Sequence, residues 1–257
     1  MNSLREQFME RLIREIFLHK GGGFVLKGGA ALRTIYGEQR LTKDIDLDFT
    51  NPHRTANSLH NSISHAIDKA ARGLRISDLL VSKPGKGEQS PKWKVNFKDV
   101  NGETFHVEVE VSRDAKRAAP GKVVQAEFIP SAAPGIARFW VDIYEGSALA
   151  ASKVAALLGR GLPRDLYDLD ALKGFVQPPD PQQVRWAIER ARLGDESPHE
   201  VLLDRLSALS WNRFQSELQN SLSPEIAERI DAAEWNSMID RVGDYVSGLL
   251  PSVLLDH

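Results

Sequence analysis

Apolar and polar positions follow one another along the chain with two different periods. Between residues 3 and 19, apolar side chains return every third or fourth position, which predicts an amphipathic helix. After it, short alternating or continuous apolar runs predict strands at 24–27, 44–50, 74–82, 93–97, 104–112 and 137–143. Helices are expected at 30–36 and from Asn51–Pro52 onward. The period is helical again at 147–158, 164–173, 181–193, 198–208, 211–220 and 224–249.

This order of elements indicates the fold class and the domains. We expect an α/β (α+β) protein in which residues 1–145 form a mixed sheet with flanking helices. Residues 146–257 are expected to form a helical domain. The dipeptide Asn101-Gly102 is typical of a hairpin turn between two of the predicted strands.

The predicted strand at residues 44–49, DIDLDF, alternates acidic and apolar residues strictly. Since side chains alternate between the two faces of a strand, Asp44, Asp46 and Asp48 share one face. The Cα atoms of successive aspartates on this face are roughly 6.6 Å apart. Their carboxylate oxygens can therefore converge on one cation, or on two catalytic metal ions, which lie about 3.5–4 Å apart. A solvated outer face is the alternative, but a row of like charges is unfavourable and Asp is depleted in strands. The pattern favours a cation site.

Two glycines, Gly28 and Gly29, stand between the predicted strand 24–27 and the helix that follows it. A glycine pair lets the backbone approach a ligand closely, and the free N–H groups of a helix N-terminus favour an anion. Taken alone, the pair is more often a simple turn. Followed about fifteen residues later by the acidic strand, it predicts a phosphate cradle beside a metal site.

These residues resemble a known family. A Gly-Gly turn, a short helix and Asp-x-Asp on a strand are the signature of the nucleotidyltransferase superfamily typified by DNA polymerase beta. The longer form, LKGGAAL…YG…RLTKDIDLDF, is similar to the AbiEii/AbiGii toxin family of nucleotidyltransferases. A second block resembles that family's downstream motif and runs Lys153-x6-Arg160-x3-Arg164-Asp165-x2-Asp168-Leu169. The two blocks cover roughly residues 20–50 and 145–172, and the rest matches only in its order of elements.

The resemblance implies a polymerase-beta-type fold and a function. The expected reaction is Mg²⁺-dependent transfer of a nucleotidyl group from an NTP to a hydroxyl, on RNA and specifically at the 3′ end of tRNA. The protein would act as the toxin of a toxin–antitoxin or phage-defence pair, with a cognate antitoxin as its partner. Two alternatives stay open: a small-molecule nucleotidyltransferase of the antibiotic-modifying kind, and a catalytically idle module that binds RNA or protein.

The resemblance also implies the metal ligands. Asp44 and Asp46 would hold Mg²⁺, which one or two carboxylates usually bind together with substrate phosphates. Asp48 falls beyond the family pair and is expected to be either in the outer shell or solvated. A third carboxylate is expected from the strand 104–112, where Glu108 and Glu110 share a face. Glu110 is preferred because the Val-Ser that follows it matches the family pattern.

Further residues are expected to bind the nucleotide or to act on its phosphates. Lys153 would neutralise phosphate charge, although a snorkelling lysine is the alternative. Lys27 would contact phosphate or lie in solvent at the strand end. Arg164 and Asp168 could form an i,i+4 ion pair. The resemblance favours a role in binding the nucleotide or in orienting Lys153. The full substrate-binding set is Lys27, Gly28, Gly29, Arg40, Thr42, Arg160, Arg164, Asp165 and Asp168.

Composition and charge exclude some kinds of site and segment, and they hint at one kind of partner. The chain has 257 residues and no Cys, which excludes disulfides and thiolate metal sites and fits the reducing cytoplasm. The charged first twenty residues show no signal peptide, and no apolar run approaches the ~18 residues of a membrane span. Residues 180–257 hold 7 Arg, no Lys and 14 Asp or Glu, a net charge of −7, so residues 1–179 carry +5. This asymmetry hints at a polyanionic partner for the first part.

Overall fold

The computed structural model describes residues 4–18, 22–36, 40–51, 53, 55–85, 88–114, 119–130, 132–133 and 135–251. The chain divides into two compact units. Unit 1 comprises Met1–Arg117 and Val123–Ile143, and unit 2 comprises Ala118–Lys122 and Tyr144–His257. Among the described residues, none of the helices combines the length and the apolar character needed to cross a membrane.

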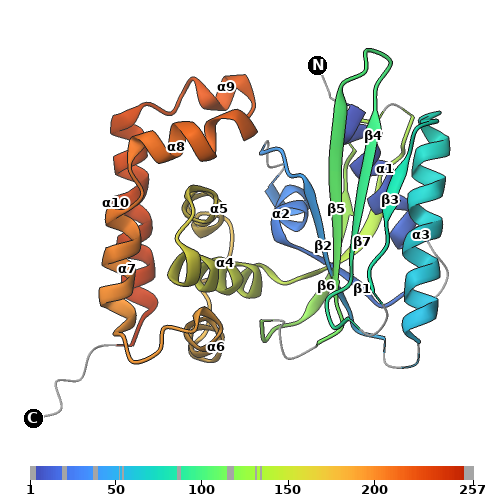
Figure 1. The fold of residues 1–257 in the computed structure, drawn as a ribbon. Coiled ribbons are helices and arrows are strands. Elements are labelled where there is room, and N and C mark those ends of the chain that lie inside the picture. Colours follow the sequence, from blue (N-terminus) through green and yellow to red (C-terminus); the bar gives the residue numbers. More distant parts are fainter. Residues whose placement is uncertain are drawn as a thin grey trace, which may run out of the picture. The chain divides into compact units, whose positions relative to one another are not determined.

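Unit 1 is built on a seven-stranded mixed sheet (Figure 1). Its strands lie in the order β3-β4-β5-β2-β1-β7-β6. β1 pairs antiparallel with β2 and parallel with β7, β2 pairs parallel with β5, and β4 pairs antiparallel with both β3 and β5. The bounds are β1 Phe24–Lys27, β2 Asp44–Phe49, β3 Leu80–Ser82, β4 Lys92–Lys98, β5 Thr104–Ser112, β6 Val123–Phe128 and β7 Phe139–Tyr144.

Three helices accompany this sheet: α1 (Leu4–Leu18), α2 (Gly28–Tyr36) and α3 (Ala56–Gly73). α1 and α3 pack against each other on one side of the sheet, and α1 contacts β5 (Figure 1). The apolar side chains that alternate along β4 and β5 are buried, and the ring of Phe8 on α1 lies 4.8 Å from that of Phe97. Hydrophobic burial therefore sets which face of each strand is covered, and the polar residues of the alternation occupy the other face.

A buried carboxylate ties α1 to the rest of unit 1. Glu10 is 1% exposed, and its side chain accepts hydrogen bonds from the backbone N–H groups of Ala132 (2.9 Å) and Ala133 (2.7 Å). Arg33 on α2 forms an ion pair with the same carboxylate at 3.0 Å. A buried charge is tolerated when it is paired and hydrogen-bonded in this way. Glu10 thus holds α2 and the segment before β7 against α1.

Unit 2 is helical. α4 packs against α5, α6 and α7, and α10 packs against α5, α7 and α8. Its core surrounds the buried Trp235, whose indole N–H donates to the backbone carbonyl of Leu209 at 2.8 Å. The bounds are α4 Gly146–Arg160, α5 Pro163–Lys173, α6 Pro181–Ala191, α7 Pro198–Ser207, α8 Trp211–Glu217, η2 Gln219–Ser221, α9 Pro224–Ala227 and α10 Ala232–Leu249.

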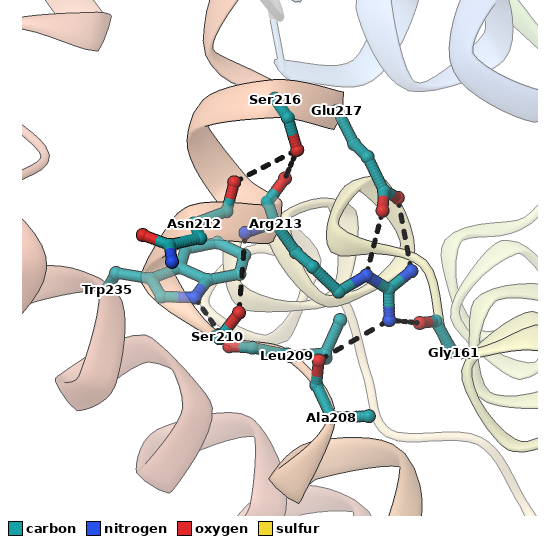
Figure 2. A network of polar contacts seen from close by, with 9 residues as sticks. All are labelled: Gly161, Ala208, Leu209, Ser210, Asn212, Arg213, Ser216, Glu217 and Trp235. Carbon is teal, nitrogen blue, oxygen red and sulfur yellow. Dashed lines mark hydrogen bonds and ion pairs between the residues drawn. The ribbon is translucent and has the colours of Figure 1, made fainter.

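Two arginines satisfy the carboxyl end of α4, where the last carbonyls of a helix lack partners. Arg213 donates to the carbonyl of Gly161 at 3.4 Å and is itself held by Glu217 at 2.8 and 3.1 Å (Figure 2). Arg205 donates to the carbonyl of Leu158 at 3.1 Å. Positive charge at a helix C-terminus is favourable. These contacts fix the turn between α4 and α5, the two helices that carry the second sequence block.

The predicted mixed sheet with flanking helices and a helical C-terminal part is confirmed, while three predicted elements are wrong in their limits. α3 begins at Ala56 rather than at Asn51–Pro52, because the Thr55 side chain caps it by accepting from the N–H of Ser58 at 3.2 Å; Pro52 lies outside the described residues. The predicted strand 74–82 shrinks to β3. The predicted helix 224–249 is interrupted, because Asp231 caps α10.

One strand, β6, was not predicted. Its sequence VVQAEF has no strict alternation, and it lies at the sheet edge with Val123 and Val124 exposed. An edge strand with an exposed face gives little periodic signal. The hairpin expected at Asn101-Gly102 is present, with Gly102 at φ +83° between β4 and β5.

Candidate active site

The junction between β1 and α2 brings the backbone and a carboxylate together. α2 begins at Gly28, directly after the last residue of β1. Gly28 has φ +64°, and a β-carbon built there would collide with Oδ2 of Asp46 and lie 3.2 Å from its Cγ. Lys27 and Asp46 are Cα partners in the β1–β2 ladder, which explains the approach. Glycine is required here both for its left-handed backbone and for its missing side chain.

The second glycine is approached by a cation. A β-carbon at Gly29 would lie 2.7 Å from Nη2 of Arg40, and Arg40 is only 8% exposed. Thr42 is also close, with its Cβ 3.6 Å from the same point. The Thr42 hydroxyl accepts from the N–H of Asp44 at 3.2 Å and donates to its carbonyl at 3.1 Å. The predicted residues Gly28, Gly29, Arg40, Thr42 and Asp46 therefore lie together at the start of α2.

The acidic face of β2 is partly neutralised by Lys27. Asp48 is buried, and Nζ of Lys27 lies 2.7 Å from its Oδ1. Asp48 is therefore not solvated, and Lys27 does not simply extend into water. Asp44 and Asp46 are half-buried on the same strand.

The parallel pairing of β2 with β5 places both candidate glutamates beside the aspartates. Glu108 is the Cα partner of Asp44, and Glu110 is the Cα partner of Asp46. On the neighbouring β4, Nζ of Lys92 lies 2.9 Å from a carboxylate oxygen of Glu108 and 2.9 Å from one of Glu110. Hydrogen bonds to Glu108 and Glu110 raise the pKa of Lys92 well above its ordinary value. The preference for Glu110 over Glu108 stays a prediction.

The second sequence block lies on α4 and α5 of unit 2. Lys153 is 8% exposed, and its Nζ lies 2.5 Å from Oδ2 of Asp168, which is fully buried. The ammonium group is thus directed to a carboxylate and does not snorkel to the surface. This contact allows Asp168 to orient Lys153. Whether Lys153 contacts phosphate stays a prediction.

A second ion pair accompanies the first. Arg160 donates two hydrogen bonds of 2.8 Å to the two carboxylate oxygens of the buried Asp165. Burial by itself raises the pKa of Asp165, but the bonds from Arg160 and the charge of Lys153 outweigh it, so the net pKa is lowered. Nε of Arg164 is buried and has no hydrogen-bond partner among the described residues.

The sequence matches a family model described as nucleotidyl transferase AbiEii toxin of type IV toxin–antitoxin systems, over residues 11–247. The chain belongs to this AbiEii family. It is therefore a nucleotidyltransferase toxin, and the family implies a nucleotide substrate and a cognate antitoxin.

Solved structures agree with this assignment at the level of the fold. The crystal structure of JHP933 from Helicobacter pylori has a TM-score of 0.51 and 17% identity, covering 95% of this chain and 92% of its own. MenT4, a nucleotidyltransferase toxin from Mycobacterium tuberculosis H37Rv, has a TM-score of 0.53 and 14% identity, covering 97% of this chain and 84% of its own. No curated protein matches the sequence.

The carboxylates on the acidic face of β2 in this AbiEii-family toxin can be compared with the oxygen ligands that Mg²⁺ requires. Among the described residues, no group of three or more Asp, Glu or His side chains is arranged to hold a metal ion. Lys92 is bonded to Glu110, and Lys27 to Asp48. Asp44 and Asp46 are carboxylates on one strand, and Asp46 lies against Gly28 at the start of α2. Two carboxylates with substrate phosphates are a usual Mg²⁺ environment, so the residues fit a two-carboxylate site.

Sequence reasoning placed Lys92 among basic residues that could meet RNA, but it did not predict that Lys92 pairs with Glu108 and Glu110. A signal was present, because β4 (KWKVNFK) alternates lysine with apolar residues as β5 alternates glutamate with valine. Two such strands in one hairpin place their charged residues on the same face. The register, which decides that Lys92 faces Glu110, depends on the loop between the strands.

Proposed function

We propose that this AbiEii-family toxin transfers a nucleotidyl group from an NTP to a hydroxyl of RNA, at the 3′ end of tRNA, with Mg²⁺ as the cofactor. The observation that carries the proposal is the junction of β1 and α2. There the Asp46 carboxylate lies against Gly28 and the Arg40 guanidinium lies against Gly29. One place thus offers groups for a triphosphate and a carboxylate for the cation that accompanies it.

The chain's own residues would bind the phosphates as follows. The first N–H groups of α2 lack helical partners and favour an anion, and the glycines leave room for close approach. The Arg40 guanidinium can donate two hydrogen bonds to phosphate oxygens. Thr42 fixes the backbone at Asp44 through its two hydrogen bonds. We assign these residues to the β- and γ-phosphates.

The carboxylates would complete the reaction site. Asp44 and Asp46 would hold Mg²⁺ with Glu110 as the third carboxylate, and the bound ion would neutralise phosphate charge and polarise the phosphoryl group. The acceptor oxygen forms a bond to the α-phosphorus, the bond from that phosphorus to the bridging oxygen breaks, and pyrophosphate leaves. The hydroxyl proton passes to a carboxylate, for which we propose Glu110. Positioning and charge neutralisation supply most of such catalysis.

The second block would add a phosphate ligand. We propose that Lys153 binds phosphate and that Asp168, at 2.5 Å, sets the direction of its ammonium group. Arg160 and Asp165 form the neighbouring bidentate pair, which supports the turn after α4.

Charge supports an RNA acceptor. Residues 1–179 carry a net charge of +5. On β4, Lys94 and Lys98 are exposed on the strand face that also carries Lys92. Lys94 is the Cα partner of Glu108, and Lys98 lies at the other end of β4. A row of cationic side chains of this kind favours a phosphate backbone. A tRNA substrate would place the toxin in the cytoplasm.

The proposed transfer to RNA is tested by offering the protein several acceptors in one reaction. The protein is incubated with each α-labelled NTP, Mg²⁺, total RNA and a set of small hydroxylated compounds that includes aminoglycosides. We expect label on RNA of tRNA size, removable by a 3′ exonuclease. Label on a small compound alone would identify an antibiotic-type enzyme. No label with any NTP or acceptor would indicate a binding module.

A further inference from the structure

Lys92 holds the carboxylate that was predicted to complete the metal site. In the β4–β5 ladder, Lys92 is the Cα partner of Glu110, and Glu110 is the Cα partner of Asp46 in the β5–β2 ladder. The three side chains therefore form one row across neighbouring strands. Nζ of Lys92 lies 2.9 Å from Glu110 and 2.9 Å from Glu108, so it bridges the two glutamates of β5.

We propose that Lys92 competes with the divalent cation for Glu110 and thereby weakens binding of the free metal ion until a nucleotide is present. The proposal rests on the metal site of the proposed function. It assigns Lys92 a positioning role, because its ammonium group acts through the Glu110 carboxylate.

The competition follows from charge and geometry. A carboxylate that is already bonded to an ammonium group must release or share it before it can coordinate a cation, and the two cations repel each other at short range. The Lys92 side chain is 46% exposed and its head is on a flexible stem, so it can leave Glu110 without disturbing the sheet. A triphosphate adds negative charge and oxygen ligands, which offset the loss of the Lys92–Glu110 contact. Metal and nucleotide would therefore bind cooperatively.

Lys94 provides a matched control on the same strand. It is exposed, points to the same face as Lys92 and is the Cα partner of Glu108. Within the part of the chain that the structure describes, Lys94 forms no ion pair. Replacing Lys94 removes the same unit of charge from the same face without freeing Glu110. Its effect measures the general electrostatic contribution alone.

The experiment measures Mn²⁺ binding to the full chain without nucleotide, by the loss of the free-ion signal in electron paramagnetic resonance. Wild type is compared with Lys92→Met, Lys94→Met and Asp46→Asn. We expect Lys92→Met to bind Mn²⁺ about tenfold more tightly, the scale of one close charge interaction that is partly screened. Lys94→Met should stay within about twofold of wild type. Adding a non-hydrolysable NTP should increase the Mn²⁺ affinity of wild type more than that of Lys92→Met.

The outcomes separate this proposal from the function on which it rests. Equal Mn²⁺ affinity in wild type and Lys92→Met, with binding lost in Asp46→Asn, would overturn the role of Lys92 and leave the metal site intact. An equal increase in Mn²⁺ affinity in Lys92→Met and Lys94→Met would also overturn the role of Lys92, because the loss of one positive charge from this face would then explain both effects. Unchanged binding in Asp46→Asn would remove the metal site itself. Lys92→Gln, which keeps a polar head, repeats the measurement if Lys92→Met does not fold.

Discussion

The Asp46 carboxylate lies against the backbone of Gly28, so closely that no β-carbon fits between them. This contact joins the proposed phosphate cradle to the acidic strand. In the sequence the two residues are separated by a helix and a loop, and the antiparallel β1–β2 pairing brings them together.

Substituting Gly28 tests that contact. Gly28→Ala must adopt φ +64° with a side chain and must displace the Asp46 carboxylate, so we expect loss of nucleotide transfer and a destabilisation of about 1 kcal/mol. Gly102→Ala is the matched control, because Gly102 has φ +83° with nothing within 4 Å. It should show a similar shift in melting temperature with normal transfer. Equal activity in both variants would argue against a role for the junction.

The Lys153–Asp168 pair should be strongly coupled. Lys153→Met leaves a fully buried carboxylate without this partner, so we expect a loss of about 3 kcal/mol in the free energy of unfolding, measured in urea. The double variant Lys153→Met/Asp168→Leu should recover part of that loss, giving a coupling energy above about 1 kcal/mol. Strictly additive effects would contradict the pairing. Nucleotide transfer is a separate readout of Lys153. If Lys153 binds phosphate, Lys153→Met should weaken transfer strongly, and Lys153→Arg should keep only part of the wild-type rate, because the two head groups differ in shape.

The Arg160–Asp165 pair predicts a pH dependence of stability. The pKa of Asp165 is lower in the folded chain than its unfolded value of about 3.9. The pair therefore contributes stability above pH 4, and the contribution is lost as the pH falls through the folded pKa. Arg160→Met should cost on the order of 2 kcal/mol at pH 7, and the difference from wild type should shrink in urea unfolding at about pH 3.

A surface pair is the control for that experiment. Arg138→Met breaks an ion pair with Glu127 at 3.5 Å in which both side chains are exposed. We expect little change in stability at either pH. A pH-independent loss in Arg160→Met, or an equal loss in both variants, would contradict the account of Asp165.

The exposed lysines of β4 predict how RNA binding depends on salt. Each phosphate contact with single-stranded RNA contributes about −0.7 to the slope of log affinity against log salt. The double variant Lys94→Gln/Lys98→Gln should bind tRNA more weakly and reduce the magnitude of the slope by about 1.4 if each lysine meets one phosphate. Lys69→Gln on α3 removes a lysine that is 51% exposed and should leave the slope unchanged. Identical slopes in all three proteins would contradict RNA binding on this face.

Much of the first unit follows from local patterns. The alternation in residues 44–49 correctly predicts that Ile45 and Leu47 are buried, and Asp48 shows its limit, because it lies on the acidic side yet is buried by pairing with Lys27. The limits of α3 and α10 depended on capping by Thr55 and Asp231, which outweighed the apolar period. Local rules indicate which residues can cap a helix, but tertiary packing decides which of them do.

Long-range contacts of the site could not be predicted in the same way. Whether Glu110 or Glu108 lies beside Asp46 depends on the register of two strands that are far apart in sequence. The position of Arg40 against Gly29 depends on the path of a loop. The Lys92 bridge depends on both the β4–β5 register and side-chain reach. None of these has a periodic signal in the sequence.

The most direct test of the central claim is nucleotide transfer by Asp46→Asn. In single-turnover assays with the preferred α-labelled NTP, Mg²⁺ and tRNA, removing one carboxylate charge from the proposed metal site should reduce the rate by about a thousandfold or more. Lys69→Gln changes an exposed lysine of α3 that pairs with Glu15 of α1, so it should transfer label at the wild-type rate, and circular dichroism should show that both variants are folded. The account predicts label on tRNA with wild type and Lys69→Gln and none above background with Asp46→Asn. Transfer by a folded Asp46→Asn protein at the wild-type rate would contradict it.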